Sequence, residues 1–485
     1  MYYIGIDLGT SAVKMLMVDE KGEFINSVSK EYPLYFPKSG WSEQNPEDWW
    51  NAVCEGLREI TSDFDKNKIG GISLGGQMHG LVMLDSDDNV IRNAILWNDG
   101  RSDEQCKYLN DVIGKDKLTE YTANIAFAGF TAPKILWVKE NEPDNFKRIS
   151  KIMLPKDYIV YKLTGVHSTD YSDGSGMLLL DVKNKCWSKE MLDICGIDDS
   201  VMPTLYESSD VVGTVTDKGA KETGLNKNVK IIAGAGDNAA AAVGTGTVEK
   251  GRCTISLGTS GTVFISSDEF SLDKNNTLHS FAHADGKYHL MGCILSAASC
   301  NKWWISDILG SEDYDESQRD IKNLGDNNVF FAPYLMGERS PHNDPNVRGA
   351  FLGISMDTTR KDMTQAVLEG VAFALRDSIE AAGKLGISVK SAAVCGGGGK
   401  SPLWCKIIAN VLNMEIFTLQ KDEGPSFGSA VLAMVGCGEY KNVSEAAKKL
   451  TAVKDRYIPE KEIAEKYEIK YNKFKKIYPS IKDLY

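Results

Sequence analysis

A Gly-Thr-Ser turn between two apolar stretches occurs twice in the chain. The first copy reads IGIDLGTS (residues 4–11) and the second reads CTISLGTSG (residues 253–261). Such a turn points backbone N–H groups and hydroxyls to one side, and this arrangement binds anions, most commonly phosphate. One copy alone is typical of an ordinary turn. Two copies at matching places in the two halves of the chain predict two loops that together bind one polyphosphate.

Both copies contain the stretch Ile-x-Leu-Gly-Thr-Ser, in which the variable position is Asp7 in the first copy and Ser256 in the second. Mg²⁺ bound to a nucleoside triphosphate is usually held by one or two carboxylates, phosphate oxygens and water. Asp7 can supply this carboxylate, directly or through water, whereas a second carboxylate in place of Ser256 would repel the phosphates. Alternatively, Asp7 is a buried residue that accepts hydrogen bonds from neighbouring amides. We favour the metal role, because a carboxylate at the end of an apolar strand is unfavourable without a cation.

Asp237 is a second carboxylate in a distinctive setting, the stretch GAGDNAAAAVG (residues 234–244). An apolar strand and a glycine turn precede it, and an Ala-rich helix follows. An aspartate before a helix is commonly its N-cap. A capping role and a ligand-binding role are both open, and they are compatible if backbone hydrogen bonds orient the carboxylate.

Two further stretches carry side chains that can reach a ligand. Gln77, Met78 and His79 lie in GGQMHG (residues 75–80), a Gly-rich loop after an apolar strand. A lone histidine is more often a core residue with its hydrogen bonds satisfied. Trp97, in LWNDGR, can stack on a ligand or lie in the core, and its sequence context does not decide between the two.

The stretch CGGGGKS (residues 395–401) ends like a P-loop, but the resemblance fails on spacing. A P-loop requires a glycine at position 394, where this chain has Val394. We therefore interpret the four glycines as a turn that brings the backbone close to a ligand. Which of Gly396–Gly399 makes that contact stays open.

The periodicity of apolar residues predicts an α/β protein built from two similar halves. In the second half the order of strands and helices repeats that of the first, which points to a duplication. Strands are expected within 2–31, 69–76, 229–233, 253–266, 280–295 and 391–395, and helices at 45–60, 101–113, 153–163, 237–244, 359–386 and from 401. The Lys-rich end, residues 464–485, is expected to be a solvated helix packed on the surface.

The composition limits the classes of function. A chain of 485 residues exceeds the size, roughly 250–300 residues, at which single cores divide. We expect two domains, 1–244 and 245–485, with a hinge near 243–252. The net charge of −12 disfavours nucleic acid as a partner. The ten cysteines contain no C-x-x-C pair and lie in apolar stretches, so we expect reduced core residues of a cytoplasmic protein. Neither a signal peptide nor an apolar run long enough for a membrane span is visible.

The chain resembles a known family at this point. Two phosphate loops on duplicated domains resemble the superfamily of actin, Hsp70 and the sugar kinases. GFTAPKILWVKEN (residues 129–141) and GAFLGISMDTTRKDMTQAVLE (residues 349–369) resemble the two diagnostic stretches of the FGGY carbohydrate kinases, over nearly the whole chain. Seven more stretches are similar to family members that phosphorylate D-xylulose: WSEQNPEDWW, GQMHG, LWNDGR, LPKDY, GDNAAAAVG, LSAASC and PYLMGERSPHNDP.

The resemblance implies two RNase H-like domains flanking a deep cleft, the first binding the sugar and carrying catalysis and the second binding the nucleotide. It implies ATP- and Mg²⁺-dependent phosphorylation of D-xylulose, with Asp237 as the general base. Together with the loops above, the residues expected at the sugar are Gln77, Met78, His79, Trp97, Asp237 and Asn238. Those expected at ATP are Gly9, Thr10, Ser11, Lys14, Gly258, Thr259, Ser260, Gly397, Gly398 and Ser401. Lys14 is otherwise an exposed strand residue, and Asp7 is the expected metal ligand.

Three alternatives are weighed against this function. Another kinase of the family would act on ribulose, gluconate, fuculose or glycerol. An ATP-gated binding protein resembling Hsp70 would need a client-binding module after its ATPase, for which the chain has no room. A sugar-sensing repressor would carry a helix-turn-helix and a basic patch before the first strand, yet an apolar strand is expected from residue 2. A homodimer is left open.

Overall fold

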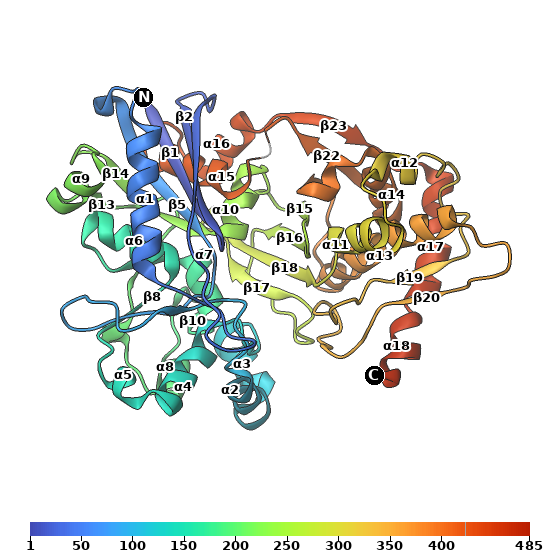
Figure 1. Cartoon of the computed structure of the whole chain (residues 1–485), viewed down its shortest axis with the longest axis horizontal. Coiled ribbons are helices and arrows are strands. Elements are labelled where there is room, and N and C mark those ends of the chain that lie inside the picture. Colours follow the sequence, from blue (N-terminus) through green and yellow to red (C-terminus); the bar gives the residue numbers. More distant parts are fainter. Residues whose placement is uncertain (422) are drawn as a thin grey trace. The chain divides into compact units, whose positions relative to one another are not determined.

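A computed structural model of the chain describes residues 1–421 and 423–485, and they form two compact units (Figure 1). Unit 1 consists of Met1–Val248, Ser280–Tyr288 and Glu423–Thr451, and unit 2 of Glu249–His279, His289–Asp422 and Ala452–Tyr485. The expected division after residue 244 therefore differs from the observed one chiefly in two segments. Residues 280–288 and 423–451 come from the second half of the sequence but belong to unit 1.

A six-stranded sheet in the order β13-β14-β5-β1-β2-β3 forms the centre of unit 1. β1 runs antiparallel to β2 and parallel to β5, and β14 also runs parallel to β5. β1 and β2 are the strands that flank the first Gly-Thr-Ser turn, as the sequence predicts. The strands are β1 Tyr2–Leu8, β2 Ala12–Asp19, β3 Phe24–Glu31, β5 Ile69–Gly76, β13 Val211–Thr214 and β14 Lys230–Gly236.

Alternation along β1 assigns its side chains to two faces of the sheet. Ile4, Ile6 and Leu8 are fully buried in a core that also contains residues of α1 (Pro46–Ile60) and α6 (Pro155–Thr164). Successive residues of a strand point to opposite faces, so Gly5 and Asp7 share the other face. That face is covered by α15 (Gly424–Cys437), which lies beside β1 and β5 in Figure 1.

The packing of α15 depends on glycines at points of close backbone approach. A Cβ atom at Gly5 would lie 1.9 Å from the carbonyl oxygen of Ser426, and one at Gly428 would lie 1.7 Å from that of Ala240. Ala240 belongs to α10 (Asp237–Gly244), so α10 and α15 are in direct contact. This contact could not be predicted from the sequence, because a glycine in an apolar helix is equally compatible with many packing partners.

Unit 2 repeats the architecture of unit 1. Its sheet contains six neighbouring strands in the order β18-β16-β15-β21-β22-β23. β15 runs antiparallel to β16 and parallel to β21. They are β15 Arg252–Leu257, β16 Gly261–Ser267, β18 Tyr288–Ile294, β21 Ser391–Cys395, β22 Glu415–Leu419 and β23 Val453–Tyr457. The strand order mirrors that of unit 1, so the α/β fold and the predicted duplication are confirmed.

The boundaries of α1, α13 and α14 agree closely with the predicted ranges 45–60, 359–386 and from 401. α1 begins after Asn45, whose side chain accepts a hydrogen bond from the Glu47 N–H, and α14 (Pro402–Leu412) begins after Ser401. α13 (Arg360–Lys384) begins with a capping box at Thr359. Around 101–113 the structure has only the short α2 (Asp103–Lys107) followed by a π-helical segment, Tyr108–Gly114.

The prediction for the Lys-rich end is only partly right. α17 (Lys461–Phe474) and α18 (Ile477–Ile481) form there, but Tyr467 and Tyr471 are completely buried in the core of unit 2. Lys470 is buried as well, and its ammonium pairs with the Glu369 carboxylate. Aromatic residues interleaved with lysines therefore form a packing face, which the high lysine content concealed.

The remaining elements connect or cover the two sheets. In unit 1 they are β4 Glu43–Gln44, β6 Val82–Leu84, β7 Ala94–Ile95, α3 Lys115–Thr122, α4 Thr131–Asn141, α5 Pro143–Lys147, β8 Lys151–Met153, β9 Ser168–Asp170, α7 Tyr171–Gly174, β10 Leu180–Asp181, β11 Cys186–Trp187, α8 Lys189–Cys195, β12 Thr204–Tyr206, α9 Asp217–Thr223 and α16 Val443–Leu450. In unit 2 they are α11 Ala298–Lys302, a π-helical segment Trp303–Ile308, α12 Tyr314–Gln318, β19 Phe330–Ala332 and β20 Ala350–Leu352. A further strand, β17, comprises His279–Ala282.

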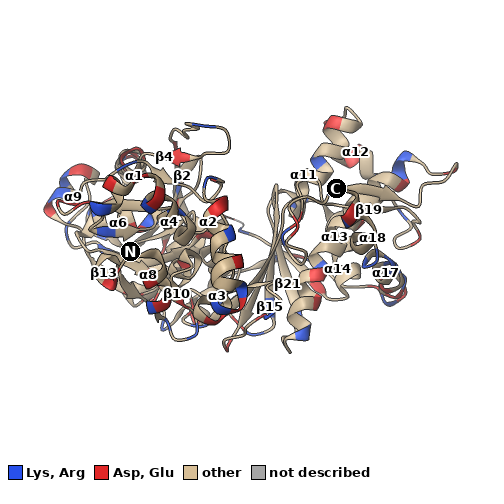
Figure 2. Ribbon diagram, turned by 90° about the horizontal axis from the view of Figure 1, so that it is seen from below, with Lys and Arg blue, Asp and Glu red and all other residues tan. Residues whose placement is uncertain are grey.

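Surface chemistry and cysteines agree with most of the expectations. Acidic and basic residues are interspersed along outer helices such as α1, α3 and α9 (Figure 2), as is typical of solvated helix faces. None of the ten cysteines, all of which lie in the described part of the chain, forms a disulfide; most are buried or partly buried, but Cys186 is exposed and is not the core residue we expected. In the described part of the chain, no helix combines the length and apolarity needed to cross a membrane.

Candidate active site

Three adjacent parallel strands of unit 1 end at the same edge of the sheet. In the register of β1 and β5, Asp7 pairs with Gly75 and Leu8 with Gly76, and Gly76 also pairs with Gly236 at the end of β14. Ligands of α/β sheets bind at the carboxyl ends of their parallel strands. This register brings together Asp7, the loop 77–80 and Asp237, which the sequence singled out separately.

Asp7 has the environment of a carboxylate that is held near a second negative charge. Burial and the charge of Asp237 together raise the pKa of Asp7 to about 7, against the opposing charge of Lys14. Lys14 lies opposite Asp7 across the hairpin and forms an ion pair with Glu423. The ammonium expected to contact a phosphate therefore already has a carboxylate partner in this structure.

Asp237 is the first residue of α10, and its N-cap position is occupied by Gly236. The capping interpretation is therefore wrong in detail, because no side chain caps this helix. Asp237 Oδ1 instead accepts hydrogen bonds from the Asn238 N–H at 2.7 Å and from Asn238 Nδ2 at 2.9 Å. Burial raises the pKa of the Asp237 carboxyl to about 6, and the two hydrogen bonds from Asn238 oppose that shift. The result is a carboxylate held in one orientation, with a pKa close to neutrality.

In the loop after β5, the side chains of Gln77 and Met78 have different surroundings. Gln77 is buried, and its Nε2 donates to Gln44 Oε1 at 2.9 Å. The Met78 side chain packs against Gly236, where an added Cβ would lie 3.0 Å from Met78 Cγ. Met78 is thus next to the residue that precedes Asp237, whereas Gln77 joins a buried amide pair.

His79 is held by several contacts. Its backbone has a φ of 71°, a left-handed conformation that is uncommon for a residue other than glycine. Its Nδ1 lies 2.6 Å from the Gly176 carbonyl oxygen, and its ring stacks on Phe130 with centroids 4.6 Å apart. A carbonyl oxygen only accepts hydrogen bonds, so Nδ1 carries a proton.

Trp97 is 47% exposed, which excludes the core position that its sequence context left open. Its Nε1 donates to Thr10 Oγ1 at 3.0 Å, which links it to the first Gly-Thr-Ser turn. In that turn the Gly9 N–H donates to the Ala12 carbonyl oxygen at 3.1 Å, and the Thr10 carbonyl oxygen accepts from Gln44 Nε2. The Ser11 carbonyl oxygen accepts from the Tyr32 N–H.

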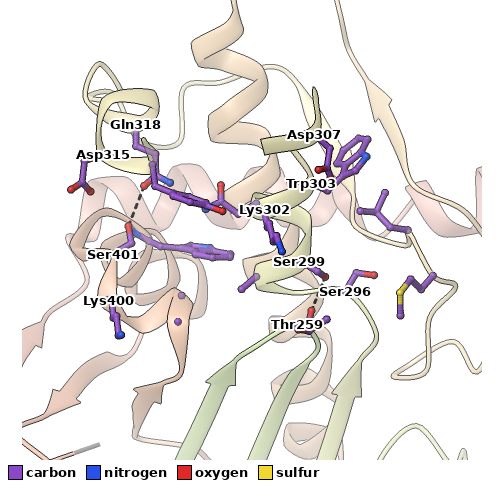
Figure 3. A pocket seen from close by; sticks show the side chains of 18 residues that line it. Thr259, Ser296, Ser299, Lys302, Trp303, Asp307, Asp315, Gln318, Lys400 and Ser401 are labelled. Carbon is purple, nitrogen blue, oxygen red and sulfur yellow. Dashed lines mark hydrogen bonds between the residues drawn. The ribbon is translucent and has the colours of Figure 1, made fainter. Parts of the chain in front are cut away.

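A cavity of about 740 Å³ in unit 2 joins the second Gly-Thr-Ser turn to the glycine-rich turn (Figure 3). This volume is within the range of small-molecule sites. The residues foreseen from the sequence that line it are Thr259, Gly397, Gly398 and Ser401, whereas Gly258, Ser260, Gly396 and Gly399 are not among its lining residues. Aromatic and basic side chains also line it: Trp303, Tyr314, Lys302, Lys400 and Trp404.

Hydrogen bonds across this cavity wall restrain two of the foreseen residues. Ser401 Oγ accepts from the Trp404 N–H at 3.2 Å and donates to Gln318 Oε1 at 3.1 Å. The Thr259 carbonyl oxygen accepts from Ser299 Oγ at 2.6 Å. Figure 3 draws this bond and the bond between Ser401 and Gln318. The Ser401 hydroxyl is thus also the cap of α14.

Comparison with known proteins gives the family. The model of the N-terminal domain of the FGGY family of carbohydrate kinases matches residues 2–244, and that of its C-terminal domain matches residues 253–437. The chain belongs to the FGGY family of carbohydrate kinases. It is therefore a sugar kinase of the actin, Hsp70 and sugar kinase fold.

Relatives of this carbohydrate kinase span its whole length. It is 39% identical over 488 residues to the xylulose kinase of Bacillus subtilis (strain 168), an alignment that covers 100% of this chain and 98% of that protein. A solved structure of a "xyloylose kinase" from Brucella ovis superposes with a TM-score of 0.94 at 38% identity and covers 100% of both chains. A gluconate kinase structure from Lactobacillus acidophilus superposes with a TM-score of 0.93 at 28% identity, covering 99% of this chain and 98% of that one.

The carbohydrate kinase carries a carboxylate that fits a nucleotide-bound Mg²⁺. Among residues 1–421 and 423–485, no group of three or more His, Cys, Asp or Glu side chains is arranged to hold a metal by itself. Mg²⁺ in phosphoryl-transfer sites does not require one, because phosphates and water supply most of its ligands. Asp7 fits this role, since its raised pKa reflects an unfavourable charge that a cation would stabilise.

A buried polar network beneath Asp237 escaped the sequence reasoning. The Gly236 N–H donates to Ser172 Oγ at 3.1 Å, and Ser172 Oγ donates to Asp170 Oδ2 at 2.5 Å. Lys156, which is fully buried, pairs with Asp170 at 2.9 Å and with Asp157 at 2.7 Å. These bonds fix the backbone immediately before Asp237. The stretch STDYSDGSG (residues 168–176) resembles a polar loop, so its burial had no signal in the sequence.

Proposed function

We propose that this carbohydrate kinase transfers the γ-phosphoryl group of ATP to the 5-hydroxyl of D-xylulose. The observation that carries the proposal is the position of Asp237 at the shared edge of β1, β5 and β14, beside Met78 and with a pKa raised to about 6. The names of the relatives support D-xylulose as the acceptor.

In the proposed reaction the sugar hydroxyl oxygen attacks the γ-phosphorus, ADP leaves, and Asp237 accepts the hydroxyl proton. A general base works best with a pKa near the working pH, and the raised pKa of Asp237 is suited to this. Phosphoryl transfer has a loose transition state, so positioning contributes more than base strength. Mg²⁺ would neutralise charge on the phosphates, and Asp7 would hold it.

The remaining expected residues have roles within the same proposal. Residues 1–244 would bind the sugar through Met78, His79, Trp97 and Asn238. Gln77 would support that loop from below, because its side chain is buried. Residues 245–485 would bind ATP, with adenosine in the cavity lined by Gly397, Gly398 and Ser401 and phosphates near Thr259. Gly9, Thr10, Ser11, Lys14, Gly258 and Ser260 stay predictions for phosphate binding.

Gluconate is the second candidate acceptor, because a relative of known structure is named gluconate kinase. A sugar acid needs a cation for its carboxylate, and Arg101 is the arginine closest in sequence to Trp97. Arg101 is buried and pairs with Asp99 and Glu43, both at 2.7 Å. Its charge is therefore already satisfied, which favours a neutral sugar over gluconate.

A substrate panel tests the proposal. ADP formation is measured for D-xylulose, D-ribulose, L-ribulose, gluconate and glycerol at one saturating ATP concentration. We expect the highest kcat/KM with D-xylulose, D-ribulose second, and poor activity with gluconate and glycerol, since sites built for hydroxyls reject analogues lacking one by up to roughly 10⁴. A clear preference for another acceptor would contradict the substrate and leave the kinase activity standing. A cytoplasmic location, a homodimer and the absence of nucleic-acid binding stay predictions from the sequence.

A further inference from the structure

The first turn of α4 contains a completely buried lysine. Lys134 is 0% exposed, and its ammonium donates to the His79 carbonyl oxygen at 2.9 Å and to the Gly129 carbonyl oxygen at 2.7 Å. Neither acceptor carries a charge. Burying an ammonium whose hydrogen bonds go to neutral partners is unfavourable compared with burying an apolar side chain of the same length. Burial lowers the pKa of Lys134 to about 7, while the charge of Asp99 opposes that shift. Because the net shift disfavours the ammonium, stability of the fold does not by itself account for a lysine here.

Lys134 acts on a residue whose backbone is strained. His79 is held at a φ of 71°, and such conformations persist where surrounding contacts over-determine them, commonly at binding sites. Three residues at the start of α4 contact His79, in addition to the Gly176 carbonyl oxygen that lies against its ring. Thr131 Oγ1 also donates to the His79 carbonyl oxygen, at 3.1 Å, and Phe130 stacks on the His79 ring.

The second acceptor of Lys134 ties the same helix to another part of the site. Gly129 packs directly on Trp97, because a Cβ atom at Gly129 would lie 2.5 Å from the Trp97 carbonyl oxygen. One ammonium thus joins the loop that carries His79 to the segment that supports Trp97. Both of these residues are expected to contact the sugar.

We propose that Lys134 is a positioning residue for sugar recognition, which fixes the backbone of His79 and thereby the direction and tautomer of its ring. This inference rests on the proposed function, because it assumes that the sugar binds beside His79. The Gly176 carbonyl oxygen accepts from Nδ1 of the same ring, so Lys134 and Gly176 hold the backbone and the ring of His79 from two sides.

The kinetic test replaces Lys134 by methionine, which keeps the length and removes the donor. We expect Lys134→Met to raise the KM for D-xylulose about tenfold, the effect of losing one charge-assisted hydrogen bond. The kcat and the KM for ATP should stay within about twofold of wild type, and the thermal midpoint should not fall. Thr131→Val removes the other donor to His79 and should raise the same KM by a smaller factor. Lys139→Met is the matched control, since Lys139 is an exposed lysine of α4 that donates to the Cys195 carbonyl oxygen.

A spectroscopic test does not depend on the substrate. In protein labelled with ¹⁵N-histidine, the ring signals of the six histidines are recorded, and His79 is assigned with His79→Gln. Wild type should show the tautomer protonated at Nδ1, and Lys134→Met should show a second ring state. An unchanged His79 signal together with an unchanged sugar KM would overturn the inference. A fall in kcat with both KM values unchanged and a lower thermal midpoint would also overturn it, since that pattern indicates general destabilisation. Failure of wild type to phosphorylate D-xylulose would instead contradict the proposed function.

Discussion

Replacing Asp237 by asparagine separates a catalytic role of this residue from a structural one. Asp237 Oδ1 accepts hydrogen bonds from the Asn238 N–H and from Asn238 Nδ2. An asparagine has the same shape and can accept both bonds through its amide oxygen. It cannot take the proton of a hydroxyl group. The start of α10 should therefore survive the substitution, while base catalysis should not.

The magnitudes follow from the environment of the carboxyl group. Removing a general base typically lowers kcat by roughly 10²–10⁴-fold, and we expect Asp237→Asn to fall in this range. Stability should change in the opposite direction. The pKa of Asp237 rises from 3.8 to about 6 on folding, so ionised Asp237 lowers the free energy of unfolding. This loss of stability is absent below pH 4 and complete above about pH 6, where it amounts to at most about 3 kcal/mol. Asparagine does not ionise, so Asp237→Asn should regain this stability.

The assay compares the rate of ADP formation with the thermal midpoint at pH 8 in the absence of nucleotide. Loss of turnover with an equal or higher thermal midpoint supports the role of a base. A stable Asp237→Asn enzyme with near-normal kcat would refute it. Asn238→Ala is the matched control, since it removes one donor to the carboxylate and leaves the base in place.

Three further predictions concern the same edge of the sheet. The kcat/KM for sugar should fall about tenfold per pH unit below about pH 6, where Asp237 becomes protonated; a flat profile down to pH 5 would contradict this, and the limb should vanish in Asp237→Asn. Asp7→Ala should abolish phosphorylation at saturating Mg²⁺ and leave sugar binding, measured by calorimetry, nearly intact; wild-type turnover would exclude the metal role. Ser172→Ala removes the acceptor of the Gly236 N–H and should lower kcat about tenfold without changing the KM for ATP. Ser172→Thr keeps a hydroxyl and should retain most of the activity, and equal rates in both variants would argue against this positioning.

Local patterns in the sequence predicted the parts of the fold that depend on neighbouring residues. Asn45 and Ser401 cap α1 and α14 as their types indicate, and the two Gly-Thr-Ser turns lie between antiparallel strands in both units. The duplication could be read because β1-β2 and β15-β16 repeat the same turn. These features require no knowledge of distant contacts.

Features that depend on distant contacts were missed. α15 packs on β1 of unit 1 although more than half of the chain separates them, and only glycines mark the contact. The aromatic face of α17 was hidden by its lysines. The sequence predicted that a helix begins at Ser401 and that Ser401 binds the nucleotide. It did not predict that capping α14 would restrain the same hydroxyl.

The residues whose burial is hardest to predict from the sequence lie in one part of unit 1. Lys134, Lys156 and Asp170 are ionisable and fully buried, whereas such residues lie mostly at the surface. Lys134 bonds to His79, and the pair of Lys156 and Asp170 is linked through Ser172 to the backbone before Asp237. Proteins depart from local consistency mainly where function requires it. Buried charges that converge on the ends of β5 and β14 therefore support a catalytic site there by an argument independent of the family match.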